Sequence, residues 1–462
     1  MHAPLVRQLA LFFACAFALI AGTSTHAATA TKPNLIFILA DDLGYGDLGL
    51  YGCPDIRTPV LDRMAREGIW FTDAYASGPL CSPTRAAFVT GRYQQRLGNH
   101  FEDFVGGGAP GLDATKHVTI AQSLKQAGYR TACFGKWNLA GGLDQEKFEY
   151  SPMAHGFDSW IGAHVNHDFH THRRERTGEP DFWKNGKPFT ATGYTDDLLT
   201  DYTLDFIEES GDRPFIIYLA YLIPHNPLQA PDDPAIQPPG HRPTYVKMVE
   251  RQDHNVGRVL DGLRRRGLDK NTLVIFTSDN GGQVAARNLP LSGRKAQLLE
   301  GGIRVPFIMW WPGVIPGGQK MEQLAITMDA TVTMLTAAGV SARADQPMDG
   351  IDLMPVATGK SPAAARTLYF RSRNVDFRQR TNEIDSMAIR EGDWKLYIRR
   401  GAERLYHLKK DIAEQNDLRR EQPELAARLK ARLEAWEKEV TPAETPFPAR
   451  PAPETPPTRE EM

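Results

Sequence analysis

The sequence predicts an α/β protein, with a large domain built on a mostly parallel, mixed sheet flanked by helices. A small C-terminal antiparallel sheet with one helix is expected to follow. The first observation behind this prediction is a set of four continuous apolar runs, each typical of a strand buried on both faces of a parallel sheet. These runs span residues 34–39, 129–136, 214–221 and 273–277.

The second observation is that helical patterns separate these runs, as in strand–helix–strand units. The helical patterns cover residues 58–68, 119–127, 195–209 and 244–266. The segment 195–209 is amphipathic with aspartates in its first turns, which favours a helix N-terminus there. A further short strand is expected at 307–310.

Chain length and a change in pattern indicate two domains. The chain has 462 residues, more than the roughly 250–300 at which a single core stops growing. Residues 31–347 are expected to form the large domain. From about residue 348, short strand patterns and a helix at about 423–439 predict a small α+β subdomain over 348–440. The Pro-rich, charged segment 441–462 is expected to be an extended, poorly ordered tail.

The N-terminus resembles an export signal. Arg7 precedes an apolar stretch from Leu9 to Ala21, and small residues follow up to Ala27, so residues 1–27 are expected to be a cleaved signal peptide. The apolar stretch falls short of the ~20 residues of a membrane-spanning helix. A periplasmic or secreted protein without a stable membrane anchor is therefore predicted.

Composition narrows the function further. The formal net charge is −2, with acids and bases nearly balanced, which argues against a nucleic-acid-binding protein. Removing the signal peptide leaves Cys53, Cys81 and Cys133. In an oxidising compartment this odd number means that at least one is unpaired or modified. The sequence leaves open whether Cys53 and Cys133 pair.

Polar clusters follow each of the four apolar runs. Because the carboxyl ends of parallel strands share one edge of a sheet, these clusters are expected to converge there. They are Asp41 and Asp42, Lys136, His225, and Asp279 and Asn280. Asp41 and Asp42 could instead form an exposed Asx turn, but hard oxygen ligands at this edge favour a Ca²⁺ or Mg²⁺ site over a zinc site.

The stretch 78–92 holds the candidate nucleophile. Ser82 suits an N-cap and Pro83 the first helical position, so Cys81 is expected at the positive end of a helix, where an anion is favoured. Arg85 adds a full positive charge. An inert, buried Cys81 is the alternative. A Cys-x5-Arg phosphatase loop is excluded, because the residue six after Cys81 is Ala87.

The run Cys-x-Pro-x-Arg followed by Thr-Gly-Arg, over 81–92, resembles the signature of the type I sulfatases of the alkaline phosphatase-like superfamily. The run Gly-Lys-Trp-Asn-Leu, over 135–139, resembles a second sulfatase motif, and 349–353 resembles the family's boundary region. The resemblance implies that a formylglycine-generating or sulfatase-maturating enzyme oxidises Cys81 to formylglycine. It also implies calcium as the metal, although the ligands alone leave magnesium open.

The resemblance further implies roles for individual residues. The hydrated aldehyde at position 81 would attack sulfur, activated by the metal and a carboxylate such as Asp279. Arg85, Lys136 and Lys295 would neutralise the sulfate. His225 or Lys295 would protonate the leaving oxygen.

Asn138 departs from the family pattern. The family usually has a histidine there, which accepts the proton of the second step, whereas a neutral amide cannot accept one. Either another group replaces it, such as an insertion histidine or a carboxylate, or turnover is impaired.

Residues 140–195 are expected to form an irregular insertion. Its four histidines, 164, 167, 170 and 172, are crowded enough for a metal tract, but a solvated, substrate-facing loop is the preferred interpretation. His170, His172 and Asn138 are the candidate contacts to substrate or sulfate. Trp183 could stack on a sugar or anchor the loop.

The predicted function is hydrolysis of sulfate esters on a poly- or oligosaccharide, because the runs 183–188 and 218–231 look like those of carbohydrate sulfatases. One alternative is a phosphodiester or phosphonate hydrolase of the same superfamily. Another is a non-catalytic protein that binds sulfated glycans and keeps Cys81 as a thiol. The sugar, the sulfate position, endo or exo action and the oligomeric state remain open.

Overall fold

The computed structural model describes residues 32–103, 110–140, 148–175, 177–376 and 381–441. All of these described residues belong to one structural unit. The predicted signal peptide and all but the first residue of the predicted tail lie outside the described residues.

The main sheet has ten strands in the order β13-β2-β12-β11-β1-β8-β4-β5-β6-β7. Its centre is parallel, since β1 pairs in parallel with β8 and β11, and β4 pairs in parallel with β8 and β5. The strands in chain order are β1 (Asn34–Ala40), β2 (Ile69–Phe71), β4 (Arg130–Lys136), β5 (Ser159–Ala163), β6 (Trp183–Lys184), β7 (Lys187–Pro188), β8 (Phe215–Ala220), β11 (Thr272–Ser278), β12 (Phe307–Trp310) and β13 (Gln319–Met321). The predicted mixed, mostly parallel sheet is confirmed.

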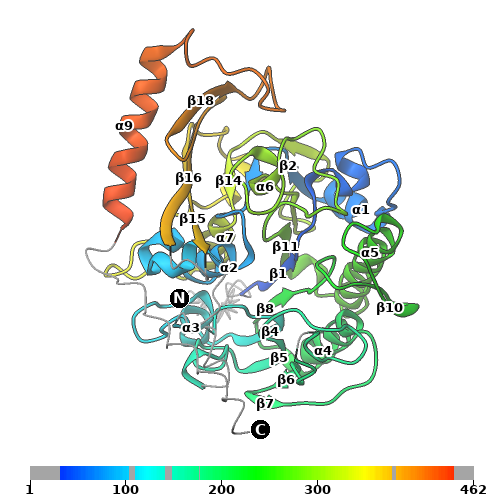
Figure 1. Cartoon of the computed structure of the whole chain (residues 1–462). Coiled ribbons are helices and arrows are strands. Elements are labelled where there is room, and N and C mark those ends of the chain that lie inside the picture. Colours follow the sequence, from blue (N-terminus) through cyan, green and yellow to red (C-terminus); the bar gives the residue numbers. More distant parts are fainter. Residues whose placement is uncertain (1–31, 104–109, 141–147, 176, 377–380, 442–462) are drawn as a thin grey trace, which may run out of the picture. The chain divides into compact units, whose positions relative to one another are not determined.

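Helices cover both faces of this sheet (Figure 1). One face is packed by α2 (Cys81–Thr90), α3 (Ile120–Gln126) and α7 (Met328–Ala337). The other is packed by α1 (Pro59–Glu67), α4 (Thr195–Ser210) and α5 (Arg242–Arg265). The alternation of side chains along β1 serves both faces, because Phe37 and Leu39 point to the first face and Ile36 and Ile38 to the second.

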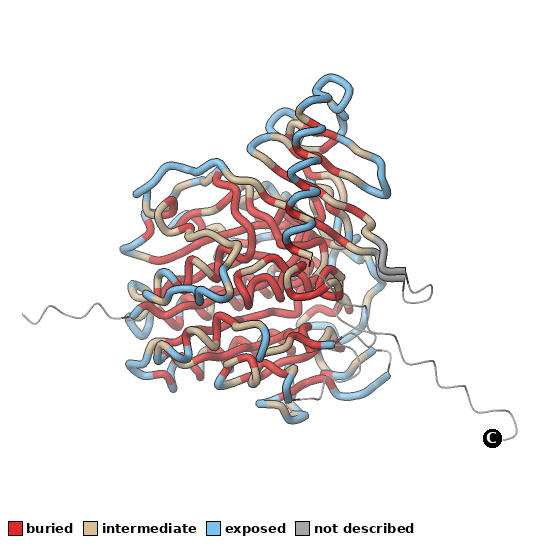
Figure 2. The backbone as a smooth tube through the Cα atoms, turned by 90° about the vertical axis from the view of Figure 1, so that its left-hand side faces the viewer, coloured by how far each residue is buried: buried red, intermediate tan, exposed pale blue. Residues whose placement is uncertain are grey.

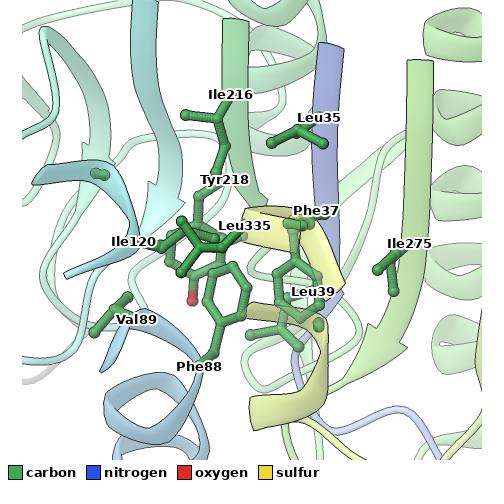
Figure 3. Packing of buried hydrophobic residues seen from close by; sticks show 14 of the residues in the cluster. Leu35, Phe37, Leu39, Phe88, Val89, Ile120, Ile216, Tyr218, Ile275 and Leu335 are labelled. Atoms are coloured by element: carbon green, nitrogen blue, oxygen red, sulfur yellow. The ribbon is translucent and has the colours of Figure 1, made fainter. Parts of the chain in front are cut away.

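The helix that carries Cys81 is anchored by aromatic packing. Figure 3 shows Phe88 and Val89 of α2 against the sheet, with Phe37 and Tyr218 nearby. The Phe37 and Phe88 rings stack with their centroids 3.7 Å apart, and every residue of α2 is buried. Dense packing on a strand that leads into the site fixes the position of the N-terminus of α2.

A separate four-stranded antiparallel sheet follows, in the order β15-β16-β17-β18. Its elements are β15 (Thr367–Asp376), β16 (Thr381–Glu391), β17 (Trp394–Arg399), β18 (Ala402–His407) and the helix α9 (Pro423–Val440). Leu429, Leu433 and Trp436 are among the buried residues of α9, in a core that this sheet shares with residues of the rest of the chain, such as Tyr75 and Leu298. The predicted C-terminal antiparallel sheet with one helix is confirmed.

Shorter elements complete the described chain. They are β3 (Ala74–Tyr75), β9 (Leu228–Ala230), β10 (Asp233–Gln237), β14 (Ala325–Ile326), α6 (Glu300–Ile303), α8 (Met354–Ala357) and six 3₁₀ turns at 45–47, 49–51, 94–97, 99–102, 148–150 and 269–271. Figure 2 shows buried residues concentrated in the interior strands and exposed residues in the peripheral loops. Within the described ranges, no helix combines the length and apolar character needed to cross a membrane.

The structure corrects two expectations about local structure. The helix at 81 begins at Cys81 itself with Leu80 as N-cap, so Ser82 is not the cap. The insertion 140–195 is not wholly irregular, because β5 joins the parallel part of the main sheet and β6 and β7 extend it. Sequence periodicity missed β5 because only five residues pair, and Gly162 interrupts its apolar pattern.

Candidate active site

The carboxyl ends of β1, β4, β8 and β11 deliver one cluster of polar side chains. Backbone hydrogen bonds hold these ends together: the Asp41 amide donates to the Ile223 carbonyl at 3.2 Å, and the Asp279 amide donates to the Ala40 carbonyl at 3.1 Å. The convergence predicted for the strand ends therefore occurs, and the N-terminus of α2 brings Cys81 to the same place.

Cys81 lies at the centre of this cluster. Its thiol donates to Asp41 Oδ1 at 3.3 Å, and the ammonium groups of Lys136 and Lys295 each lie 3.5 Å from its sulfur. As the first residue of α2, it is close to backbone N–H groups that no capping side chain satisfies. An anion bound at residue 81 would thus meet two ammonium groups and a positive helix end.

The thiol itself is a poor nucleophile here. Burial, followed by the negative charges of Asp279 and Asp41, raises the pKa of Cys81 far above its usual value, despite the opposing lysines. Only a thiolate attacks efficiently. The unmodified cysteine would therefore be protonated and a weak nucleophile in these surroundings.

Asp41 is held by cations on two sides. Its Oδ2 lies 2.5 Å from Lys136 Nζ and 3.4 Å from Arg85 Nη2. Burial alone would raise the pKa of Asp41, but the surrounding cations, led by Lys136, hold it well below its usual value. Asp41 is therefore ionised at neutral pH.

Asp42 is oriented by a different set of groups. Its backbone is in the left-handed region, with φ of 68°. This conformation costs energy and persists only where the surrounding structure enforces it. Its carboxylate lies 2.7 Å from Lys295 Nζ, accepts from Asn280 Nδ2 at 2.6 Å, and also accepts from Gln283 Nε2.

Asp279 pairs with Arg85, which is entirely buried. The guanidinium donates to Asp279 Oδ2 through Nη2 at 2.7 Å and Nε at 3.2 Å, while its Nη1 donates to the Lys136 carbonyl at 2.7 Å. Burial and the nearby Asp41 raise the pKa of Asp279 to about 6, although Arg85 opposes the shift. Arg85 thus links β4, β11 and α2 through one side chain.

His225 is a neutral imidazole in this setting. Burial, with Lys295 adding to it, lowers its pKa to about 4. Its Nδ1 lies 2.6 Å from the Asn226 carbonyl, so Nδ1 carries the proton, and Nε2 lies 3.4 Å from Asp42 Oδ2.

The oxygen-rich part of the cluster fits a hard divalent cation. Among the described residues, Asp41, Asp42, Cys81 and His225 can each place a ligand atom within 4.8 Å of the others. The Oδ1 atom of Asn280 is buried and has no hydrogen-bond partner. An orphaned amide oxygen beside buried carboxylates is the environment that Ca²⁺ or Mg²⁺ would satisfy.

Asn138 occupies a constrained position beside Ser82, the neighbour of Cys81 in the chain. It is buried with φ of 56°, and its Oδ1 accepts from Ser82 Oγ at 2.8 Å. Its Nδ2 has no hydrogen-bond partner. With its oxygen bonded to Ser82, the amide offers hydrogen atoms to a ligand and no proton acceptor.

Among the described residues, no ring nitrogen of the insertion histidines forms a hydrogen bond or ion pair with this cluster, although the His164 carbonyl accepts from the Asn138 amide at 3.1 Å. His167 bonds the Asp181 carbonyl and Thr195 Oγ1, His170 bonds the Ala230 carbonyl, and His172 bonds the Gly193 carbonyl. His164 packs against Trp160 and Trp183. The ring nitrogens of His167, His170 and His172 bind backbone and loop groups, whereas Nδ1 of His164 is buried without a hydrogen-bond partner. His164, His167 and His172 are buried. The expectation of a solvated histidine loop is therefore wrong for these three, and their contacts are structural.

Three polar residues of the site escaped the sequence analysis. Asn166 Nδ2 lies 3.5 Å from Asp41 Oδ2. Asn226 Nδ2 donates to Gln283 Oε1 at 2.7 Å, and Gln283 Nε2 in turn donates to the Asp42 carboxylate. Gln283 and Asn226 stand within three residues of predicted site residues, so proximity to a strand end could have indicated them. Asn166 carries no such signal.

A parallel-sheet edge that gathers buried carboxylates and lysines around a cysteine at a helix N-terminus suits the class of hydrolases that act on anionic esters. Comparison with known proteins narrows this class. The sulfatase family pattern matches residues 33–340, and the pattern of the N-sulphoglucosamine sulphohydrolase C-terminal region matches residues 294–439. The chain therefore belongs to the sulfatase family and is a sulfuric ester hydrolase.

Individual relatives agree with this assignment. N-acetylgalactosamine-6-sulfatase of Canis lupus familiaris is 34% identical over 396 residues, which covers 79% of this chain and 72% of the relative. Human steryl-sulfatase is 31% identical, covering 76% of this chain and 73% of the relative. The crystal structure of Ps i-CgsB in complex with k-i-k-neocarrahexaose superposes with a TM-score of 0.80 at 30% identity, covering 89% of this chain and 94% of that one.

The buried, protonated state of Cys81 predicts its reactivity. In protein produced without conversion of Cys81, iodoacetamide at pH 8 is expected to alkylate half-exposed Cys53 and to leave Cys81 and Cys133 unmodified. Burial raises the pKa of all three thiols, but only Cys81 and Cys133 are buried enough to exclude the reagent. Peptide mass spectrometry over time measures this, with urea-unfolded protein as the control. Alkylation of Cys81 as fast as Cys53 would contradict the geometry.

Proposed function

We propose that this sulfatase hydrolyses sulfate esters on a carbohydrate, using a formylglycine made from Cys81 and a bound Ca²⁺ ion. The observation that carries the proposal is the position of Cys81 Sγ, 3.3 Å from Asp41 Oδ1 and 3.5 Å from both Lys136 Nζ and Lys295 Nζ. A carboxylate beside the nucleophile and two cations around it are what transfer of a sulfuryl group requires.

Different side chains bind the sulfate, orient the carboxylates and supply a proton. Lys136 and Lys295 bind the sulfate oxygens and neutralise charge that develops on them. Arg85 is wholly buried and bonded to Asp279, so it orients the carboxylates and adds positive charge to the site. Neutral His225 has its unprotonated Nε2 toward Asp42 and the site. Lys295 therefore holds the proton that the leaving alcohol oxygen needs, unless His225 first takes up a proton at Nε2.

Asp41, Asp42, Asp279 and Asn280 would hold the metal ion, which as a Lewis acid polarises sulfate and activates an oxygen nucleophile. The orphaned Asn280 Oδ1 and the three buried carboxylates support this role. Calcium is preferred on the resemblance to the sulfatases, because the oxygen donors by themselves suit magnesium as well.

The modified residue would supply an aldehyde hydrate, and so an oxygen nucleophile, at position 81. Its formation requires a formylglycine-generating or sulfatase-maturating enzyme as a partner. The raised pKa of the Cys81 thiol means that an unmodified residue would be protonated and would attack poorly.

Sulfated sugars are the substrate class that we infer. Relatives named N-acetylgalactosamine-6-sulfatase and a neighbour solved with a neocarrahexaose both indicate carbohydrate. The signal-like residues 1–27 support action in the periplasm or outside the cell. The phosphonate alternative has weaker support, since phosphonate monoester hydrolase of Agrobacterium radiobacter shares the fold at 20% identity.

The direct test measures sulfate and phosphate release from a panel of sulfated sugars and phosphonate or phosphodiester analogues. Cys81→Ala is expected to abolish sulfate release while the protein stays folded, because it removes the nucleophile. Cys53→Ala is the matched control and is expected to keep activity. The mass of the peptide carrying residue 81 should show the aldehyde. Unchanged activity of Cys81→Ala would refute the mechanism, and an unmodified thiol would favour a glycan-binding protein.

Removing the orphaned oxygen tests the metal site. Asn280→Ala is expected to weaken Ca²⁺ binding by roughly tenfold or more, since one hard ligand is lost from a site of 6–8 oxygens. Calorimetric titration of metal-depleted protein with Ca²⁺ and with Mg²⁺ measures this. Asn416→Ala, at an exposed position, is the control. Equal affinities for wild type and Asn280→Ala would exclude Asn280 as a ligand.

Substitution of Asn138 tests whether the site lacks a proton acceptor for the second step. Asn138→His is expected to change kcat, by up to the roughly 10²–10⁴-fold that a positioned general base supplies, without loss of Ca²⁺ binding. Steady-state kinetics across pH 5–9, with calorimetry for the metal, measures both. Asn138→Ala is the control, because it removes the amide without adding a base. No kinetic difference between Asn138→His and wild type would show that the position is irrelevant.

A further inference from the structure

Lys295 lies on a loop, residues 292–303, that touches the catalytic centre at several points; we call it the Lys295 loop. The Lys295 amide donates to the Gly282 carbonyl at 3.2 Å, and the Ala296 amide donates to the Pro79 carbonyl at 2.9 Å. Gly282 follows the Asp279–Asn280 pair closely and Pro79 precedes Cys81. The loop backbone therefore connects the metal-ligand strand end with the nucleophile helix.

The far side of this loop is held by the C-terminal part of the chain. Glu414 Oε2 accepts the Glu300 amide at 2.7 Å, at the start of α6, and Ser292 Oγ donates to the Ala413 carbonyl. The Gly301 amide donates to the Ser292 carbonyl at 2.6 Å, which closes the loop. Residues 413 and 414 thus contact both ends of the segment that presents Lys295.

A buried set of charges reinforces this contact. Lys395 Nζ, on β17, lies 2.8 Å from Glu300 Oε1 and 2.8 Å from Glu414 Oε1, with all three side chains fully excluded from solvent. The other oxygen of Glu300 accepts from Tyr75 at 2.6 Å and from Arg304 Nη1 at 3.2 Å. Buried charges of this kind are costly when a partner is lost, so each group holds the others in place.

The backbone of Glu414 provides independent evidence. Its φ is 53°, in the left-handed region that a non-glycine residue rarely adopts. Such a conformation persists only where the surroundings enforce it, and it concentrates at functional sites. Here it places the carboxylate between the Glu300 amide and Lys395.

We infer that Glu414 and Lys395 are positioning residues for catalysis: they fix the Lys295 loop, so that the C-terminal sheet sets the position of the Lys295 ammonium beside residue 81. This inference rests on the proposed function in one respect, namely that Lys295 acts on the sulfate. The clamp itself, which we define as Glu300, Lys395 and Glu414, is described by contacts alone.

A second buried ion pair serves as a control that distinguishes an effect on the position of Lys295 from a general loss of stability. Glu102 lies 2.6 Å from Arg371 Nη2 on β15, and both side chains are fully buried. It joins the same C-terminal sheet to the large domain through the turn 99–102, and it has no contact with the Lys295 loop among the hydrogen bonds and ion pairs of the described residues. Glu102→Ala is therefore a matched control that removes a buried carboxylate from an Arg partner.

The test compares Glu414→Ala, Glu414→Gln and Glu102→Ala in the full-length, mature enzyme. Glu414→Ala is expected to lower kcat for sulfate release at least about tenfold with a smaller change in KM, because a misplacement of about 1 Å can cost more than that. Glu414→Gln, whose amide oxygen still accepts the Glu300 N–H, is expected to recover part of the loss. Glu102→Ala is expected to lower the unfolding midpoint in urea but to keep kcat within about twofold.

Hydrogen exchange supplies a readout independent of activity. In Glu414→Ala, amides of 295, 296 and 301 are expected to exchange faster than in wild type, whereas in Glu102→Ala they should not. Wild-type kcat and exchange in folded Glu414→Ala, or an equal fall of kcat in Glu102→Ala, would overturn the inference. If Glu414→Ala does not fold, Glu414→Gln decides by the same two readouts. If the wild type releases no sulfate, the proposed function fails while the exchange comparison still tests the clamp.

Discussion

Charge compensation among buried groups is the constraint on which the rest of this structure depends. Three carboxylates lie at one edge of the sheet with almost no exposure, and three cations surround them. The carboxylates are Asp41, Asp42 and Asp279, and the cations are Arg85, Lys136 and Lys295. An unpaired ion in such a place costs several kcal/mol, so each strand end must bring its charge to the correct place. A divalent cation would add to this balance and would be attracted by the carboxylates.

The architecture meets that constraint by making the supports rigid. The strands that end at the site are the central, doubly buried strands of the sheet, and α2 is clamped against them by the stack of Phe37 on Phe88. Arg85 of α2 is also bonded to Asp279, after β11, and to the Lys136 carbonyl at the end of β4, so one side chain connects three elements. The loop that carries Lys295 lacks a central strand, and it is held by a buried ionic contact to the C-terminal sheet instead.

The sequence predicted the residues at the centre of the site but not those of the surrounding insertion. The residues at strand ends could be predicted because apolar runs fix where strands end, and parallel strands end at one edge. The insertion 140–195 could not be predicted in this way. Its histidines gain their partners from residues far along the chain, as His170 does from Ala230, and β5 is recognisable only by its pairing with β4. Asn166 reaches Asp41 across 125 residues without any local pattern that marks it.

The sequence by itself determined the fold class, the order of strand and helix, the Cys81 motif and the residue types at the strand ends, because these depend on local periodicity and spacing. Only the tertiary structure decided which groups face each other. It sets the high pKa of Cys81, the neutral state of His225, the orphaned oxygen of Asn280 and the attachment of the Lys295 loop to Glu414. These properties arise from burial and from charges distant in sequence, and desolvation exists only once the chain has packed.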